Sequence, residues 1–322
     1  MKNSILMTFI LVCIIPSMLL CFFERSENLE QAPVEEQLQE NTQENDAEKE
    51  NTQIYVKLLK DDKIEVMSLD TYVFGVVLAE MPADFELEAL KAQAVVARTY
   101  TCKKMENPKH SNADVCTDSA CCQAYMDEFS YLLAGGTNES LQKVRSAVKT
   151  TQSEVLKYDG KLIEATYFSC SGGKTEDAAE VWGADVPYLQ AVSSPGEEKA
   201  SHYTDTVKFT AKEFANMLDI SSEGSPGKWV ENITYTEGGG VHTIVIQGKT
   251  FTGTEIRQKL GLRSTAFVIS IAGNSVTVTT KGFGHRVGMS QYGADAMAVQ
   301  GSLYQDILYH YYTGVTLSNL SG

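Results

Sequence analysis

The sequence predicts an α+β fold with mixed helices and antiparallel hairpins around a cleft, preceded by a transmembrane helix. Apolar segments pair across turn residues in several places, as at Asp159-Gly160, which strongly indicates a tight hairpin. Other segments carry apolar residues at helical spacing, as in residues 87–97. Regular alternation of strands with helices is missing from the sequence, which argues against a parallel sheet with crossover helices.

Turn and capping residues set the expected element boundaries. Asp70 is expected to cap a helix that ends before Met81-Pro82, because the residue before a proline disfavours the helical region. Thr210 and Glu213 form a capping box for a later helix. The expected helices cover residues 70–79, 85–100, 138–149, 210–218 and 288–312. The expected strands cover residues 54–60, 63–69, 154–157, 161–168, 204–209, 228–236, 241–247, 265–272 and 275–280.

The N-terminus carries a long apolar stretch, Ile5–Phe23, with Lys2 before it. A bilayer core is crossed by about 20 helical residues, so the stretch is long enough to span it. The positive charge on its N-terminal side favours a cytoplasmic N-terminus with the rest of the chain outside. We expect residues 1–23 to be a membrane anchor. A cleaved signal peptide is the alternative, but no small-residue cleavage site follows.

Residues 24–53 are expected to be a disordered acidic stalk. Residues 24–52 hold ten acids against Arg25 and Lys49, a net charge of −8, and few large apolar residues. Such a segment cannot bury enough surface to offset its ordering entropy. Residues 54–322 are expected to form one extracytoplasmic domain. Because the sequence shows no basic stripe, nucleic acid is not expected as a partner.

Glu80 is the strongest candidate for a general acid. It lies where the expected helix stops, among Leu78, Ala79, Met81 and Pro82. A helix C-terminus carries partial negative charge and an apolar setting disfavours a carboxylate, so both raise the pKa. A raised pKa is what a general acid needs near neutral pH. The alternative is a solvated glutamate at a helix end.

Four soft or borderline metal ligands lie close together in the loop over residues 102–125. His110, Cys116, Cys121 and Cys122 fall within 13 residues, which suits a tetrahedral zinc site although the spacing is not a zinc-finger pattern. A disulfide is the alternative, since the chain is expected outside the membrane. Adjacent Cys121 and Cys122 cannot easily pair with each other, and metal ligation removes that difficulty.

Two loops rich in small residues, 169–176 and 282–294, are candidates for ligand contact, because glycine lets a backbone approach a ligand closely. Neither contains a phosphate-binding motif. Cys170 with His285 is a conceivable nucleophile and base, although no orienting third group is visible. Lys91, Gln93 and Arg98 are polar groups on an alanine-rich helix, where a solvated polar face is the simpler interpretation.

Together these segments resemble the stage II sporulation protein D family, a peptidoglycan-acting family. The resemblance extends over nearly the whole expected domain. It rests on AEMPADFELEALKAQAVVARTY (79–100), DVCTDSACCQAY (114–125), FSCSGGKTE (168–176), VWGADVPYLQAV (181–192) and GFGHRVGMSQYGADAMAVQG (282–301).

The resemblance implies a lytic transglycosylase that cleaves the bond between N-acetylmuramic acid and N-acetylglucosamine in peptide-stripped glycan strands during engulfment. It implies that Glu80 is the catalytic acid and that zinc, one ion per chain, is structural, since four protein ligands leave no open position. The expected metal ligands are His110, Cys116, Cys121 and Cys122. The expected substrate-binding residues are Lys91, Gln93, Arg98, Ser171, Gly172, Gly173, His285, Ser290, Gln291 and Tyr292.

This sequence departs from the family pattern at three positions. Cys121 stands where the family has histidine, Cys170 where it has threonine, and Arg286 where glycine is common. The first departure changes the implied ligand set to one histidine and three cysteines.

Three rival functions remain open: a non-catalytic glycan-binding activator of a cell-wall amidase, a zinc hydrolase using His285, and a cysteine peptidase using Cys170.

The resemblance also implies partners and a location. Peptidoglycan glycan strands are the expected substrate. The expected partners are a membrane-anchored amidase resembling stage II sporulation protein P and a further sporulation membrane protein that holds both as a scaffold. The expected location is the mother-cell membrane, with the catalytic domain facing the forespore.

Overall fold

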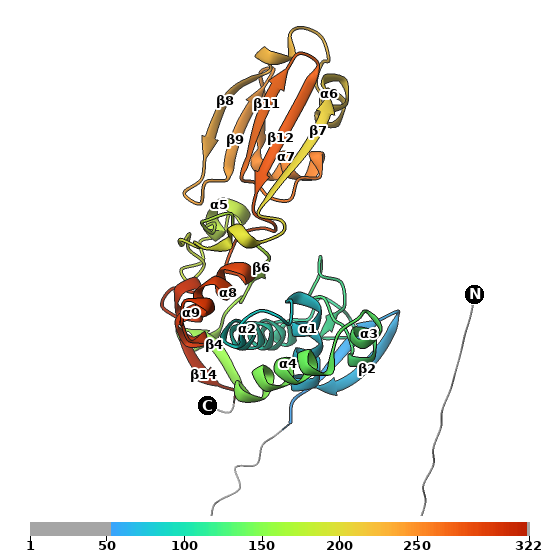
Figure 1. Ribbon diagram of the computed structural model, residues 1–322, viewed down its shortest axis with the longest axis vertical. Coiled ribbons are helices and arrows are strands. Elements are labelled where there is room, and N and C mark those ends of the chain that lie inside the picture. Colours follow the sequence, from blue (N-terminus) through green and yellow to red (C-terminus); the bar gives the residue numbers. More distant parts are fainter. Residues whose placement is uncertain (1–52, 321–322) are drawn as a thin grey trace, which may run out of the picture. The chain divides into compact units, whose positions relative to one another are not determined.

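The computed structural model describes residues 53–320, so the expected anchor and almost all of the expected stalk lie outside the described residues. The chain divides into the units Met1–Asn51 and Thr52–Gly322, and the described residues belong to the second. Within residues 53–320, no helix is long and apolar enough to cross a membrane. The expectation of mixed helices and sheets is confirmed (Figure 1).

The elements alternate irregularly along the chain. The helices are α1 (Leu69–Glu80), α2 (Leu87–Glu106), α3 (Glu128–Leu133), α4 (Asn138–Thr150), α5 (Ala178–Trp182), α6 (Ala211–Leu218), α7 (Gly253–Leu260), α8 (Gln291–Val299) and α9 (Tyr304–Tyr311). The strands are β1 (Tyr55–Lys60), β2 (Lys63–Ser68), β3 (Val115–Cys116), β4 (Glu154–Tyr158), β5 (Lys161–Leu162), β6 (Tyr167–Phe168), β7 (Thr204–Thr210), β8 (Val230–Tyr235), β9 (Val241–Ile246), β10 (Lys249–Thr252), β11 (Phe267–Ala272), β12 (Ser275–Lys281), β13 (Met289–Ser290) and β14 (Thr316–Asn319).

The first hydrophobic core is built around α2. This helix packs against α1 and α4 and also against α8, α9 and β4 (Figure 1). Neighbours surround it closely because alanines such as Ala92, Ala94 and Ala97 are fully buried and take little room. The sheets β2-β1-β3 and β14-β4-β5 belong to this part of the chain. The end of α1, where Glu80 lies, is therefore fixed by a packed helix.

The second hydrophobic core lies within residues 204–281. The sheets β11-β12-β7 and β10-β9-β8 form it together with α6 and α7. Strand β12 alternates between buried and exposed residues, with Val276 and Val278 pointing into the core. Both helices begin with a capping box, Thr210 with Glu213 and Thr252 with Glu255. The sequence did not reveal that this segment builds its own core.

Several expected boundaries are corrected by the structure. Ser68, not Asp70, caps α1, and its hydroxyl accepts from the N–H of Thr71. The single C-terminal helix expected over residues 288–312 is two helices, because Gly301 adopts a φ of 92° between them. Helices α3 and α5 were missed because they are too short for periodicity to show. Strand β14 pairs with the distant β4, which local sequence does not signal.

Candidate active site

Glu80 is the last residue of α1, and its carboxyl group is partly buried. Burial raises its pKa above the ordinary value. Two donors oppose this effect in part. The main-chain N–H of Ala124 donates to Oε1 at 2.7 Å, and the phenol of Tyr167 hydrogen-bonds the carboxyl group. The result is a carboxyl group whose pKa lies above the ordinary value and whose orientation is fixed by two donors.

Tyr167 comes from the short strand β6 and was not among the expected site residues. Burial raises the pKa of its phenol well above the ordinary value, so the group stays protonated and can donate. The same hydroxyl donates to Oε1 of Gln123 at 3.2 Å. One phenolic hydrogen therefore serves two acceptors, and an ionised Glu80 is the stronger of them. The sequence carries no signal for Tyr167 beyond its place before the 168–176 motif.

The four expected metal ligands lie together. The ligand atoms of His110, Cys116, Cys121 and Cys122 are all within 4.8 Å of one another. His110 Nε2 lies 3.7 Å from the Cys121 sulfur and 3.6 Å from the Cys122 sulfur, and the two sulfurs are 3.9 Å apart. The three cysteines are free thiols, so no disulfide forms in the described residues of this loop.

These separations fit a tetrahedral zinc ion. With Zn–S of about 2.3 Å and Zn–N of about 2.0 Å, ideal geometry puts two sulfurs about 3.8 Å apart and a sulfur and nitrogen about 3.5 Å apart. One nitrogen and three thiolates are also the soft donor set that zinc prefers. The cluster is joined to the candidate acid through the chain itself, because Ala124 follows Cys122 by two residues.

The three expected residues on α2 differ in exposure. Lys91 pairs with Glu88 at 2.6 Å and is partly exposed. Arg98 is fully buried and donates to the main-chain oxygens of Glu154 and Val148, so it holds the first core together and does not reach the surface. Gln93 is also fully buried, and neither atom of its amide has a partner among the described residues.

The two small-residue loops lie side by side, because β6 pairs with β13 in parallel. A buried carboxylate that the sequence analysis missed, Glu197, organises them. It accepts from the hydroxyls of Ser171 at 2.8 Å and of Ser290, and from the N–H of Gly172 at 2.8 Å. Ser171, Ser290 and Gln291 are buried, so they shape the loops, whereas Gly172, Gly173 and Tyr292 are partly exposed.

His285 is held as a neutral imidazole. Burial lowers its pKa to about 4. Its Nδ1 accepts from the N–H of Val287 at 3.2 Å, and the ring also hydrogen-bonds the main chain of Tyr167. The ring lies between the rings of Trp182 and Phe168, at centroid distances of 5.4 and 5.5 Å. This residue therefore positions the chain next to Glu80, and the metal-ligand cluster is complete without it.

Cys170 is placed poorly for a nucleophile. Its side chain is fully buried and contacts the Glu197 carboxylate at 3.3 Å. Burial, followed by that negative charge, raises the pKa of the thiol to about 12. A thiol of this kind is almost entirely un-ionised at neutral pH, and the thiolate is the nucleophilic form. These observations argue against the cysteine peptidase alternative.

Arg286 adopts a φ of 66° and is buried. It pairs with the buried carboxylate of Glu176 at 2.8 Å. The same guanidinium donates to the carbonyl oxygens of Ser171, Lys174 and Gly238 at 2.6, 2.9 and 2.7 Å. A single side chain therefore ties the 169–176 loop to the turn between β8 and β9.

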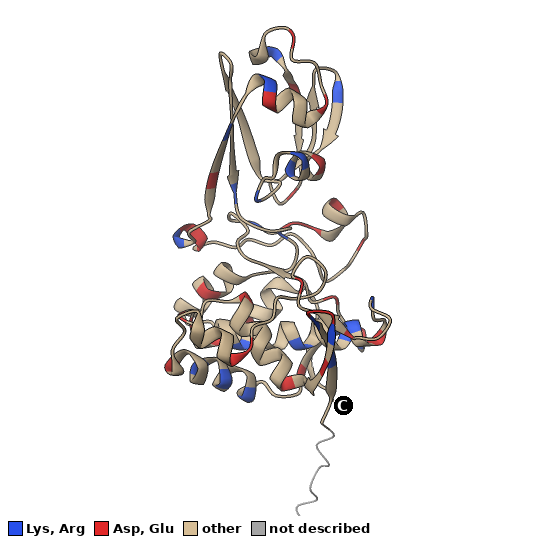
Figure 2. Cartoon of the chain, turned by 90° about the vertical axis from the view of Figure 1, so that its right-hand side faces the viewer, with Lys and Arg blue, Asp and Glu red and all other residues tan. Residues whose placement is uncertain are grey.

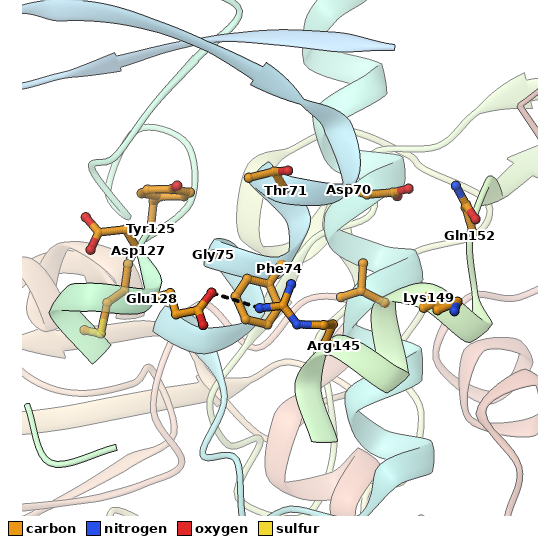
Figure 3. Close-up of a pocket in the computed structure, with 12 residues that line it drawn as sticks. Asp70, Thr71, Phe74, Gly75, Tyr125, Asp127, Glu128, Arg145, Lys149 and Gln152 are labelled. Atoms are coloured by element: carbon orange, nitrogen blue, oxygen red, sulfur yellow. Dashed lines mark hydrogen bonds and ion pairs between the residues drawn. The ribbon is translucent and has the colours of Figure 1, made fainter. Parts of the chain in front are cut away.

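A separate cavity of about 470 Å³ lies against α1 and α4 (Figure 3). Tyr125 and Phe74 contribute to its wall, and Glu80 does not. Arg145 pairs with Glu128 at 2.8 Å and lies over the Phe74 ring. Acidic and basic residues are interspersed along the described part of the chain (Figure 2).

Comparison with known proteins gives consistent matches. A family model described as "Stage II sporulation protein" matches residues 59–158. Stage II sporulation protein D of Bacillus subtilis (strain 168) is 43% identical over 267 residues, covering 80% of this chain and 76% of that protein. Its counterpart in Bacillus amyloliquefaciens is 42% identical over 261 residues, covering 79% and 75%. The amidase enhancer of Bacillus subtilis (strain 168) is 30% identical over 303 residues, covering 76% of this chain and 40% of that protein. The chain belongs to the stage II sporulation protein D family.

Proposed function

We propose that the chain is a peptidoglycan lytic transglycosylase that acts on peptide-stripped glycan strands during engulfment in sporulation. The observation that carries the proposal is the Glu80 carboxyl group, which has a raised pKa and is held by the N–H of Ala124 and the phenol of Tyr167. Membership of the stage II sporulation protein D family supports peptidoglycan as the class of substrate.

The reaction needs one carboxyl group. Protonated Glu80 gives its proton to the oxygen that links N-acetylmuramic acid to N-acetylglucosamine, and the bond from that oxygen to the anomeric carbon breaks. Positive charge develops on the muramic ring. The Glu80 carboxylate then takes the proton of that sugar's own 6-hydroxyl, and the oxygen closes onto the anomeric carbon as a 1,6-anhydro bridge. Because the attacking oxygen is intramolecular, no second carboxylate nucleophile is required.

The phenol of Tyr167 is suited to both halves of this cycle. While Glu80 is protonated, the phenolic hydrogen is free to remain with Gln123. Once Glu80 has given up its proton, the carboxylate draws that hydrogen, because a hydrogen bond to a charged acceptor is stronger than one to a neutral amide. The N–H of Ala124 keeps Oε1 in place throughout. Neither the phenol of Tyr167 nor the N–H of Ala124 has to move far, so Glu80 returns to its protonated form in the same position.

One structural zinc ion is proposed at His110, Cys116, Cys121 and Cys122. When bound, it would supply cross-links and no reaction chemistry, since four protein ligands fill a tetrahedral shell. The loop has little apolar content of its own, so ligation would fix its path. That path sets where the N–H of Ala124 points, and therefore how Glu80 is held.

The proposed location is the mother-cell membrane, with residues 1–23 as the anchor, residues 24–53 as a spacer and the remaining chain facing the forespore. A membrane-anchored amidase resembling stage II sporulation protein P is the proposed supplier of stripped glycan, and a further sporulation membrane protein is the proposed scaffold. The motivation is chemical: the usual wall polymer carries stem peptides, and the arrangement around Glu80 supplies one acid for glycosidic cleavage.

The test is product analysis. The full-length chain in mild detergent is incubated with peptide-free glycan, and products are examined by mass spectrometry for 1,6-anhydro ends. We expect such ends from the parent chain and a loss of at least a hundredfold with Glu80→Gln, a typical contribution of general acid catalysis. Glu106→Gln is the matched control, because Glu106 also ends a helix but is exposed and paired with Lys103. Absence of anhydro ends from the folded parent chain would overturn the proposal.

A second candidate function is a non-catalytic, glycan-binding activator of a cell-wall amidase. The 30% identity to the amidase enhancer favours it. Under this alternative, the parent chain and Glu80→Gln would increase peptide release by an amidase equally, and neither would produce 1,6-anhydro ends. If glycan cleavage depends on Glu80, amidase activation cannot be the only function of the chain.

A further inference from the structure

Trp182 is an exposed aromatic side chain that no part of the catalytic cycle uses. The chain has two tryptophans. Trp229 is buried in the second core, where it stacks with Phe214. Trp182 is 46% exposed at the end of α5. Indole combines a large apolar face with a polar N–H, so a half-exposed tryptophan offers a contact surface that suits an amphipathic ligand.

The position of the Trp182 ring is well fixed. Asp177 caps α5 through the N–H of Ala179, and Gly183 ends the helix in the left-handed conformation. Glu180, on the same helix, pairs with His242 of β9 at 2.9 Å. The indole thus sits on a short helix that is capped at both ends and connected to β9, which limits the conformational entropy lost when a ligand covers it.

Three contacts connect Trp182 to the candidate acid. Its ring lies 5.4 Å from the ring of His285, tilted by 53°. His285 hydrogen-bonds the main chain of Tyr167, and the phenol of Tyr167 hydrogen-bonds the Glu80 carboxyl group. One side of the indole therefore lies against His285, which hydrogen-bonds the main chain of Tyr167. Nearly half of the Trp182 surface remains open to solvent.

We propose that Trp182 is a stacking platform for a sugar ring of the glycan strand, in a subsite that is connected to Glu80 through His285 and Tyr167. This rests on the proposed function. A pyranose presents a face of C–H groups that packs on an aromatic ring, while its hydroxyl and acetamido groups project from the edge into water. Indole has the largest such face among the side chains, and its N–H can still meet a polar group at the rim. A glycan strand is a run of such rings, so a flat aromatic surface on the same side of the domain as the candidate acid would fix one ring of a bound strand.

The two tryptophans allow a direct binding test. In the full-length Glu80→Gln chain, which leaves the glycan uncut, peptide-free glycan oligosaccharides are titrated while indole fluorescence is recorded. We expect a saturable blue shift of the emission, because Trp182 loses water and Trp229 is already buried. Adding Trp182→Phe should remove this signal. By calorimetry on the same background, Trp182→Ala should weaken glycan binding about tenfold, the upper range for an aromatic contact.

Kinetics separates binding from chemistry. In the otherwise unaltered chain, Trp182→Ala should raise KM about tenfold and change kcat by less than about twofold. Trp182→Tyr should recover much of the loss. Phe129→Ala is the control, since Phe129 is 71% exposed on α3 and touches none of these groups. Its KM should equal that of the parent.

The outcomes distinguish this inference from the proposed function. Calorimetric binding of glycan with an unchanged indole emission, or tight binding by a folded Trp182→Ala chain, overturns the platform and leaves catalysis by Glu80 standing. A saturable Trp182 signal in the Glu80→Gln chain, together with no 1,6-anhydro ends from the folded parent chain, supports the platform and overturns catalysis.

Discussion

The main-chain N–H of Ala124 donates to the Glu80 carboxylate at 2.7 Å, across 44 residues of sequence. Ala124 follows the candidate metal ligands Cys121 and Cys122, and the ligand Cys116 lies on β3, which pairs with β1 in the middle of the loop. A disturbance of the cysteine cluster therefore reaches the candidate acid through the main chain, without any direct contact between the two. This relationship couples the stability of a loop to the orientation of a single carboxyl group.

Removal of one cluster ligand should lower stability before it changes the chemistry. We expect Cys116→Ser to lower the melting temperature by about 5 °C or more, because ligation supplies most of the order of the loop. Elemental analysis of protein purified without added metal should show close to one zinc per chain. Cys102→Ser is the control, since Cys102 is a buried thiol outside the cluster. A metal-free preparation that is equally stable and fully active would contradict the prediction.

Replacement of Tyr167 by phenylalanine should change the pH dependence of cleavage. The phenol lowers the pKa of Glu80, in opposition to burial, by stabilising the ionised carboxylate. Without it, the pKa of Glu80 rises further and the acid stays protonated to higher pH. The basic limb of the kcat/KM profile should therefore move to higher pH, by up to about one unit, which corresponds to one hydrogen bond.

Tyr125→Phe provides the matched comparison for that measurement. Tyr125 is also a partly buried tyrosine, but its hydroxyl contacts the sulfur of Met67 at 3.6 Å and not the Glu80 carboxyl group. Its profile should overlay that of the parent chain. A Tyr167→Phe profile with an unmoved or acid-shifted basic limb would show that the phenol does not act on the protonation of Glu80.

The ion pair between Arg286 and Glu176 should behave as a buried pair. Arg286→Met leaves the Glu176 carboxylate buried and unpaired, and we expect a loss of about 3–5 kcal/mol in the free energy of unfolding. The double variant Arg286→Met with Glu176→Gln should recover part of this loss. Lys174→Ala removes the exposed pair of Lys174 with Glu237 and should cost less than about 1 kcal/mol. Additive losses in the double variant, measured by chemical denaturation, would rule out the coupling.

The sequence predicted those parts of the site that depend on local signals. Glu80 lies at a helix end because Met81-Pro82 stops the helix, and the ligands of the cysteine loop lie together because they are close in sequence. Tyr167 and Glu197 were missed because their partners come from distant segments. Burial was also hard to foresee: α2 has neighbours on all sides, so Arg98 lies in the core even though the family resemblance implied that it binds substrate.

The last prediction concerns the order of two wall-cleaving reactions. A stem peptide is attached to the N-acetylmuramic acid ring, the same ring on which the 1,6-anhydro bridge forms, and the proposed subsite requires that strand to lie close against Glu80 and Trp182. Cleavage by this chain should therefore follow removal of the peptides by a separate amidase. The purified full-length chain is given intact peptidoglycan and, in parallel, the same material pretreated with an amidase. We expect 1,6-anhydro ends to form at least about tenfold faster from the pretreated wall, with Glu80→Gln as the blank for both. Equal release from the two materials would mean that the chain accepts peptide-bearing glycan and that no amidase has to act first.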